Sequence, residues 1–323
     1  MDLSAKSILV TGGAGFIGSH LVKGFNHQGC ADLVIVDHLR QNAKWKNLAS
    51  LRYVAYLDRD ELFSYLEHKH NMPDVIIHMG ACSATTEKDE NYLLNNNTKY
   101  TKRLFDYCAE NNVRFIYASS AATYGNGSLG YSDQTQKLHP LNCYGYSKYL
   151  FDQWALSGSS KPPQWVGLKF FNVYGPNEYH KDFMASMVFH GYQQIKENGK
   201  IRLFKSYRKD FADGCQKRDF VYIADVLNVV NFFLQHEDQS GIFNVGTGMA
   251  RSFNDLAQAL FRALAQTPNI EYIEMPPDLR AKYQYFTQAD ISSLRGAGYT
   301  KEFYSLENGI KDCVACYQIK EKE

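Results

Sequence analysis

Three glycines near the start of the chain stand where an apolar run gives way to a helical pattern. They are Gly12, Gly15 and Gly18 of "ILVTGGAGFIGSHLVKGF". Glycine lets the backbone turn sharply and approach a pyrophosphate, and the N-terminus of a helix offers unpaired N–H groups and the positive end of a dipole. About 20 residues further along, a second apolar run ends in Asp37, where a carboxylate would meet the ribose of an adenosine. The pattern therefore predicts a dinucleotide-binding turn rather than a purely structural glycine loop.

The residues around Asp37 bear on which nicotinamide dinucleotide would bind. A carboxylate at this position repels a 2′-phosphate, so Asp37 alone favours NAD over NADP. Cations follow it in the sequence and would offset that repulsion: His38, Arg40, Lys44, Lys46 and, after the third predicted strand, Arg59. A solvated basic loop explains the same residues equally well, so the sequence leaves NAD and NADP both open.

The first half of the chain alternates short β-rich runs with longer helical patterns. The runs typical of strands are "SILVTGG", "ADLVIVD", "RYVAYLD", "DVIIHMG", "RFIYASS" and "WVGLKFFNVYG". Strands that are apolar throughout and alternate with helices predict a parallel sheet covered on both faces, which is a doubly wound α/β fold. We expect residues 1–176 to form this dinucleotide-binding domain. We expect residues 177–323 to form mainly a smaller α/β substrate lobe, with 219–250 returning to the first domain.

Charge and cysteine content exclude several classes of protein. The 35 Lys and Arg residues nearly cancel the 34 Asp and Glu residues, so we expect no binding to nucleic acid or to an anionic membrane. The seven cysteines are odd in number and scattered, which favours reduced thiols in the cytoplasm over disulfides or a metal site. Cys313 and Cys316 form a lone CxxC, for which helix packing is the better interpretation. No apolar stretch is long enough to span a membrane, and the N-terminus lacks the layout of a signal peptide.

Hydroxyl-bearing side chains follow the fifth predicted strand, in "FIYASSAATYG". Because ligands bind at the carboxyl ends of such strands, Ser119, Ser120 and Thr123 are expected beside a nicotinamide. Tyr144 and Lys148 come later in the chain, four positions apart and therefore on one face of a helix. A neighbouring ammonium and a positive nicotinamide ring would favour the phenolate, so we expect a lowered Tyr144 pKa and a catalytic role for both residues.

The order of these motifs resembles a known family. "TGGAGFIG", "YASSAATYG" and "YGYSK" are similar to the extended short-chain dehydrogenase/reductases that act on nucleotide sugars. Narrower segments, "GACSATTE", "HKDFMAS" and "FTQAD", resemble the ADP-L-glycero-D-manno-heptose 6-epimerase family, and the likeness runs over nearly the whole chain. The resemblance implies a Rossmann-type domain and a nucleotide-sugar substrate.

This resemblance also implies an activity and its catalytic residues. Enzymes of that family use a tightly bound nicotinamide cofactor, usually NADP, to oxidise carbon 6 of ADP-D-glycero-D-manno-heptose and return the hydride to the other face. The product, ADP-L-glycero-D-manno-heptose, supplies the lipopolysaccharide core. Tyr144 and Lys181 match the two acid/base residues of the family. Ser120 matches the hydroxyl that contacts the sugar oxygen, and Lys148 matches the lysine on the nicotinamide ribose. A homo-oligomer, specifically a pentamer, is implied in the same way.

Further binding residues are carried over from the family pattern. Those matched to the cofactor site are Gly12, Gly15, Phe16, Ile17, Gly18, Asp37, His38, Lys44, Arg59, Met79, Gly80, Ala81, Cys82, Ser83, Asn96, Lys148, Val173 and Lys181. Those matched to the ADP-heptose site are Asn172, Phe183, His190, Phe204, Lys205, Ser206, Tyr207, Arg218 and Tyr283. Arg218 is also expected on chemical grounds, because a diphosphate in a nearly neutral protein needs a local guanidinium that binds it bidentately. A structural salt bridge is the alternative for Arg218.

Two other functions compete with this one. Another nucleotide-sugar enzyme, a 4-epimerase or a 4,6-dehydratase, would share the fold and the cofactor. A dehydratase usually has an Asp-Glu pair after the active-site hydroxyl residue, whereas Ala121 and Ala122 follow Ser120 here, which favours epimerisation. A nucleotide-sensing Rossmann protein without catalysis is the alternative of a different class. Such a protein would typically lack the tyrosine or the lysine, and this chain has both Tyr144 and Lys148.

Overall fold

The computed structural model describes residues 3–39, 43–280 and 283–321, which form two compact units. The first unit consists of the chain up to Thr123, together with Leu138–Lys169 and Val226–Phe243. The second unit consists of Tyr124–Lys137, Phe170–Asp225 and the chain from Asn244 onward. The chain therefore crosses between the units several times. The assignment of 1–176 to the cofactor and 177–323 to the substrate stays a prediction about ligand contacts.

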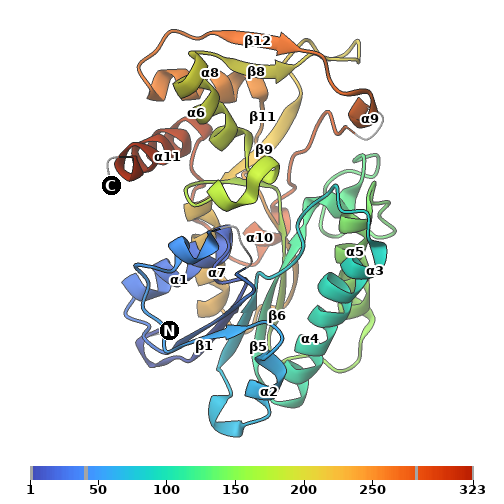
Figure 1. Ribbon diagram of the computed structural model, residues 1–323. Coiled ribbons are helices and arrows are strands. Elements are labelled where there is room, and N and C mark those ends of the chain that lie inside the picture. The colour runs from blue at the N-terminus through green and yellow to red at the C-terminus, as the bar shows by residue number, and fades with distance from the viewer. Residues whose placement is uncertain (1–2, 40–42, 281–282, 322–323) are drawn as a thin grey trace. The chain divides into compact units, whose positions relative to one another are not determined.

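A seven-stranded sheet forms the centre of the first unit (Figure 1). Its order is β10-β6-β5-β4-β1-β2-β3, and the pairs among β1 to β5 are parallel. This is the order of a doubly wound dinucleotide-binding sheet, so the predicted fold class is confirmed. The strand bounds are β1 (Ile8–Thr11), β2 (Leu33–Asp37), β3 (Ala55–Asp58), β4 (Val75–His78), β5 (Arg114–Ser120), β6 (Trp165–Phe170) and β10 (Gly241–Val245).

Helices cover both faces of this sheet, with α1 and α7 on one side and α4 and α5 on the other (Figure 1). Because of this cover, every residue of β1, β2 and β4 is buried, which explains their uninterrupted apolar sequences. Under α4 and α5, the ring of Phe105 packs edge-on against Phe115 and Phe151. The α-helices are α1 (Phe16–His27), α2 (Leu62–Leu66), α3 (Glu90–Leu93), α4 (Tyr100–Glu110), α5 (Cys143–Ser157) and α7 (Ile223–Gln235). Short 3-10 helices are η1 (Leu3–Ala5), η2 (Lys44–Asn47), η3 (Lys69–Asn71) and η5 (Ala121–Tyr124), and η4 (Leu94–Lys99) is a π-helix.

The second unit is a smaller α/β assembly with two sheets. One sheet has the order β11-β9-β7, and the other pairs β8 with β12 in parallel. Serine side chains begin its main helices: Ser186 caps α6, Ser252 forms a capping box with Asp255 at α8, and Ser305 caps α11. The bounds are β7 (Asn172–Tyr174), β8 (Ile201–Phe204), β9 (Lys217–Tyr222), β11 (Ala250–Ser252), β12 (Ile270–Ile273), η6 (Tyr179–Met184), α6 (Met187–Asn198), α8 (Phe253–Ala263), α9 (Pro277–Arg280), α10 (Ser292–Gly296) and α11 (Leu306–Lys320).

The cysteines and helices bear on two further expectations. All seven cysteines are free, and Cys313 is buried on α11 in the core of the second unit, as expected for helix packing. Within the described ranges, no helix is long and apolar enough to span a membrane.

Close packing at the first βα turn gives a test of the fold. A Cβ added at Gly18 would lie 2.1 Å from the carbonyl oxygen of Gly12, so Gly18→Ala must displace the backbone of the turn. We expect it to lower the free energy of unfolding by more than about 1 kcal/mol in urea titrations. Gly158→Ala, in the same unit, is the control, because its Cβ would meet the nearest atom at an ordinary 3.4 Å. Equal stability of the two variants would contradict this account.

Candidate active site

The glycine turn joins β1 to α1 and lies against the segment that follows β4. Gly12 has φ +67°, which favours glycine, and a Cβ there would come within 2.6 Å of the Gly80 nitrogen. Gly15 is the N-cap of α1, and its amide donates to the Gly12 carbonyl at 3.0 Å. The predicted strand–turn–helix arrangement is thus present, and the close approach of Gly12 to Gly80 leaves no space for a Cβ.

The carboxylate of Asp37 is already bonded within the protein. It ends β2, is only 6% exposed, and accepts hydrogen bonds from the amides of Ala14 at 2.9 Å and His38 at 2.7 Å. The ammonium of Lys44 pairs with it at 2.9 Å. Asp37 therefore ties the glycine turn to η2, and its charge is neutralised by Lys44, neither of which the sequence pattern indicated.

The other cations predicted near the adenosine end have different surroundings. His38 pairs with Asp58 at 2.9 Å, and this contact lowers the pKa of Asp58. Arg59 follows β3 and donates to the side chain of Asn96, which joins two predicted cofactor residues. Lys46 is exposed. Arg40 lies outside the described residues.

The predicted cofactor segment Met79–Ser83 is held by residues that the sequence analysis missed. Asn97, buried on η4, accepts from the Cys82 amide at 2.9 Å and donates to the Cys82 carbonyl at 3.0 Å. His78, at the end of β4, lies between the hydroxyls of Thr11 at 2.6 Å and Thr101 at 2.9 Å. Burial lowers the pKa of His78 to about 3, so its ring is neutral and serves as a hydrogen-bonding bridge. A lone His or Asn gave no signal of this in the sequence.

The structure brings Ser120, Tyr144 and Lys148 together in the first unit. Ser120 ends β5, and the interaction of its side chain with Tyr144 lowers the Tyr144 pKa in part. Asn142 caps α5 through the amide of Gly145 at 2.8 Å, which places Tyr144 in the first turn. Lys148 lies one turn further on, and its ammonium donates to the Ala118 carbonyl at 2.8 Å.

Burial is the largest cause of the pKa shifts of Lys148 and Tyr144. It lowers the pKa of Lys148 to about 8, and the nearby Asp152 charge acts in the opposite direction. It also raises the pKa of Tyr144, although the interaction with the Ser120 side chain lowers it in part. The expected lowering of the Tyr144 pKa is therefore wrong for the protein's own groups, because loss of hydration outweighs their stabilisation of the phenolate.

Lys181 lies in the second unit beside a buried carboxylate that the sequence analysis missed. Its ammonium is 3.1 Å from Glu178, whose side chain is fully buried. Glu178 also accepts from the amide of Ser186 at 2.8 Å, the hydroxyl of Ser186 at 2.6 Å and the amide of Gly175 at 3.2 Å. The next residue, Asp182, has φ 47° and ψ −130°, a strained conformation for a non-glycine residue. Glu178 thus fixes the loop that carries Lys181.

Arg218 is buried on β9 between two aromatic rings. Its guanidinium carbon is 5.1 Å from the ring centre of Tyr283 and 5.7 Å from that of Phe253. It donates to the Lys217 carbonyl at 2.9 Å, and burial lowers its pKa. Among the residues that the structure describes, no carboxylate forms an ion pair with Arg218. The alternative of a structural salt bridge therefore has no support, and the guanidinium is suited to an anionic ligand.

The remaining residues predicted to contact substrate lie in the second unit, as do Val173 and Lys181. Asn172 begins β7, His190 lies on α6, and Phe183 is 70% exposed. Phe204 ends β8, with its ring 6.2 Å from that of Tyr283. Further contacts hold the segment after β8: Lys205 pairs with Glu274, Ser206 donates to Asp213, and Tyr207 bonds to Tyr285 and Glu274.

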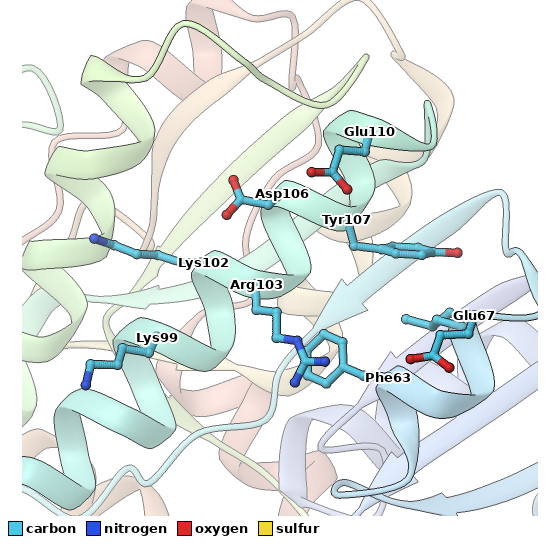
Figure 2. A pocket seen from close by; sticks show the side chains of 9 residues that line it. Phe63, Glu67, Lys99, Lys102, Arg103, Asp106, Tyr107 and Glu110 are labelled. Atoms are coloured by element: carbon cyan, nitrogen blue, oxygen red, sulfur yellow. The ribbon is translucent and has the colours of Figure 1, made fainter.

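A hollow of about 440 Å³ lies between α2 and α4 of the first unit and is not this site (Figure 2). The guanidinium of Arg103 lies 3.5 Å from the ring centre of Phe63 across it. None of the predicted cofactor, catalytic or substrate residues lines it. The lining residues are Phe63, Leu66, Glu67, Lys99, Lys102, Arg103, Asp106, Tyr107 and Glu110.

Comparison with known proteins agrees with the geometry. Residues 8–246 match the model of the NAD dependent epimerase/dehydratase family. The chain belongs to this family. It is 54% identical to the ADP-L-glycero-D-manno-heptose-6-epimerase of Fusobacterium nucleatum, over 97% of this chain and 98% of the relative, and 50% identical to that of Nitratidesulfovibrio vulgaris, over 96% and 97%. The Helicobacter pylori crystal structure of the same name superimposes with a TM-score of 0.83 at 31% identity, covering 98% of each chain. The resemblance predicted from the motifs is confirmed at the level of the family.

The contacts of Glu178 give a test in this second unit. Glu178→Ala removes an acceptor from two backbone amides and one hydroxyl, so we expect the free energy of unfolding in urea to fall by about 1 kcal/mol or more. Glu197→Ala is the control, because Glu197 is exposed on α6 of the same unit. If both variants unfold at the same urea concentration, Glu178 does not hold the loop.

Proposed function

We propose that this member of the epimerase family interconverts ADP-D-glycero-D-manno-heptose and ADP-L-glycero-D-manno-heptose by transient oxidation and reduction at carbon 6. The observation that carries the proposal is the placement of Ser120 at the end of β5 with Tyr144 and Lys148 one turn apart on α5, in a chain whose full-length relatives bear the name of that enzyme. The reaction involves no net redox change. The hydride removed from carbon 6 must therefore be held and returned by a bound carrier, and the proton of the carbon 6 hydroxyl must be taken up and returned by an acid/base group.

The residues of the first unit suit a nicotinamide dinucleotide. A pyrophosphate would bind at the N-terminus of α1, beside the turn where Gly12 packs closely against Gly80, and Lys148 offers a buried ammonium to a ribose. When bound, the nicotinamide would accept a hydride from carbon 6 and return it to the opposite face. Ser120 orients Tyr144, and the positive charge of a bound oxidised nicotinamide would favour the Tyr144 phenolate over the phenol. The phenolate takes the proton of the carbon 6 hydroxyl in one direction, and the phenol so formed returns it in the other.

Lys181 is proposed as the second acid/base. The sugar must present its carbon 6 oxygen in two orientations, so a second proton carrier spares Tyr144 from serving both. The Lys181 ammonium lies 3.1 Å from Glu178, and an ammonium held in this way can donate a proton to the ketone oxygen. For the other end of the substrate, the buried Arg218 guanidinium supports binding of the diphosphate.

We further propose NADP as the preferred cofactor, with NAD also accepted. The support is the ion pair between Lys44 and Asp37, because a carboxylate whose charge is compensated by an ammonium repels a 2′-phosphate less. Arg59, hydrogen-bonded to Asn96 after β3, supplies a second cation at the edge of the sheet. The proposal extends to a homo-oligomer in the cytoplasm, a pentamer by resemblance to the family.

The function is tested by incubating the purified protein with ADP-heptose and resolving the two carbon 6 epimers. We expect Tyr144→Phe to lower the rate by roughly 100-fold or more, because the ring stays while the exchangeable proton is lost. Lys181→Met should also impair epimerisation severely, and neither change should abolish NADPH binding. A wild-type protein that does not interconvert the epimers would refute the function.

A matched control separates catalysis from helix damage. Tyr146→Phe removes a hydroxyl from an exposed tyrosine on the same helix and should leave the rate unchanged. If Lys181→Met raises only the KM for the sugar, Lys181 is a binding residue and Tyr144 serves both faces.

The cofactor preference is tested at Lys44. We expect Lys44→Ala to weaken NADP binding more than NAD binding, because only NADP carries the 2′-phosphate. Dissociation constants from calorimetry give the comparison, and Lys46→Ala, an exposed lysine two positions on, is the control. Equal losses for both cofactors would show that Lys44 does not act on a 2′-phosphate, either directly or through Asp37.

A further inference from the structure

An ion pair is buried directly behind the catalytic group of the first unit. The ammonium of Lys169, on β6, lies 2.9 Å from the carboxylate of Asp152, on α5. Their side chains are only 4% and 1% exposed. A buried ion pair loses hydration on both sides, and its attraction offsets that loss only where further hydrogen bonds satisfy both groups. Such a pair requires an explanation beyond simple packing.

Further hydrogen bonds are present on both members of the pair. Asp152 accepts from the hydroxyls of Tyr117 at 2.9 Å and Ser119 at 2.7 Å. Lys169 donates to the hydroxyl of Thr123 at 2.8 Å. A Cβ at Gly167 would lie 2.4 Å from the Tyr117 oxygen, so the neighbouring strand leaves space for this tyrosine. The surroundings therefore hold the Asp152 carboxylate in one place.

The pair is connected to the catalytic residues through both members. Asp152 follows Lys148 by four residues on α5, and therefore lies on the same face one turn away. On the other side, the Thr123 hydroxyl that Lys169 contacts donates to the Ser120 carbonyl at 2.8 Å. One buried network thus reaches both Lys148 and Ser120.

The electrostatic effect on Lys148 comes mainly from one residue. Burial lowers the pKa of Lys148, and among its neighbours Asp152 and, to a smaller extent, Cys82 raise it. His78, which faces Lys148 from β4, is neutral because its own pKa is about 3. Tyr144, on the same helix, has a raised pKa and is uncharged. Asp152 is therefore the charge that favours the ammonium form.

We propose that Asp152, held in place by Lys169, is a positioning residue that keeps the Lys148 ammonium charged for its contact with the cofactor. The proposal rests on the proposed function only in that Lys148 binds the cofactor. Lys169 has two effects: it compensates the Asp152 charge, and it fixes the Ser120 carbonyl through Thr123.

The test measures the dissociation constant of NADPH, from its fluorescence, as the pH rises. In the wild-type protein affinity should fall near pH 8, where Lys148 loses its proton. Asp152→Asn alone would leave Lys169 buried without a counter-charge, so the informative variant is Asp152→Asn combined with Lys169→Met. We expect the pH midpoint to fall by about one unit or more, because an opposite charge no longer favours the ammonium.

The control is Lys169→Arg, which keeps both charges and should keep the wild-type midpoint. A double variant that unfolds cooperatively on heating with an unchanged midpoint would overturn the proposal. One that no longer unfolds cooperatively would assign the pair a structural role and overturn it too. The readout does not depend on the sugar: a wild-type protein with a midpoint near pH 8 but no epimerase activity would contradict the proposed function alone.

Discussion

The site in the first unit depends on the burial of one ammonium group, that of Lys148. Taking this charge out of water disfavours it, and the low pKa of about 8 reflects that cost. Two features offset the cost: the hydrogen bond to the Ala118 carbonyl and the charge of Asp152. Because β5 supplies Ala118, Ser119 and Ser120 in succession, the strand that presents the Ser120 hydroxyl, which we propose to be catalytic, also supports the lysine. The strand and the helix are thereby fixed relative to each other.

Two buried charged side chains of the second unit, Glu178 and Arg218, differ in their surroundings. Glu178 is fully surrounded by donors, so it stabilises the loop around Lys181. Arg218 instead lies between aromatic rings and, among the described residues, makes one hydrogen bond to a carbonyl. A saturated carboxylate has no capacity for a ligand, whereas a buried guanidinium with several unused donors does. Glu178 therefore shapes the loop around Lys181, whereas Arg218 is suited to bind an anion.

Much of this arrangement follows from local sequence patterns. The position of Asp37 at the end of β2 and the shared helix face of Tyr144 and Lys148 were both predicted, since strand length and helical spacing fix them. The neutralisation of Asp37 by Lys44 was not predicted, because η2 must fold back onto β2 for the two to meet. Glu178 was missed because a single glutamate in a loop has no spacing that distinguishes it.

The sequence by itself determined the order of strands and helices along the chain, the glycine turn and the shared helix face of Tyr144 and Lys148, because these depend on residues a few positions apart. Only the tertiary structure decided the charge states. The pKa of Tyr144 is raised rather than lowered, and Lys148 titrates near 8, because both values depend on burial and on partners. Asp152 on α5 and Lys169 on β6 form an ion pair in which each charge compensates the other. These side chains lose their hydration only when segments far apart in the sequence pack together, so no local sequence pattern predicts the resulting pKa shifts.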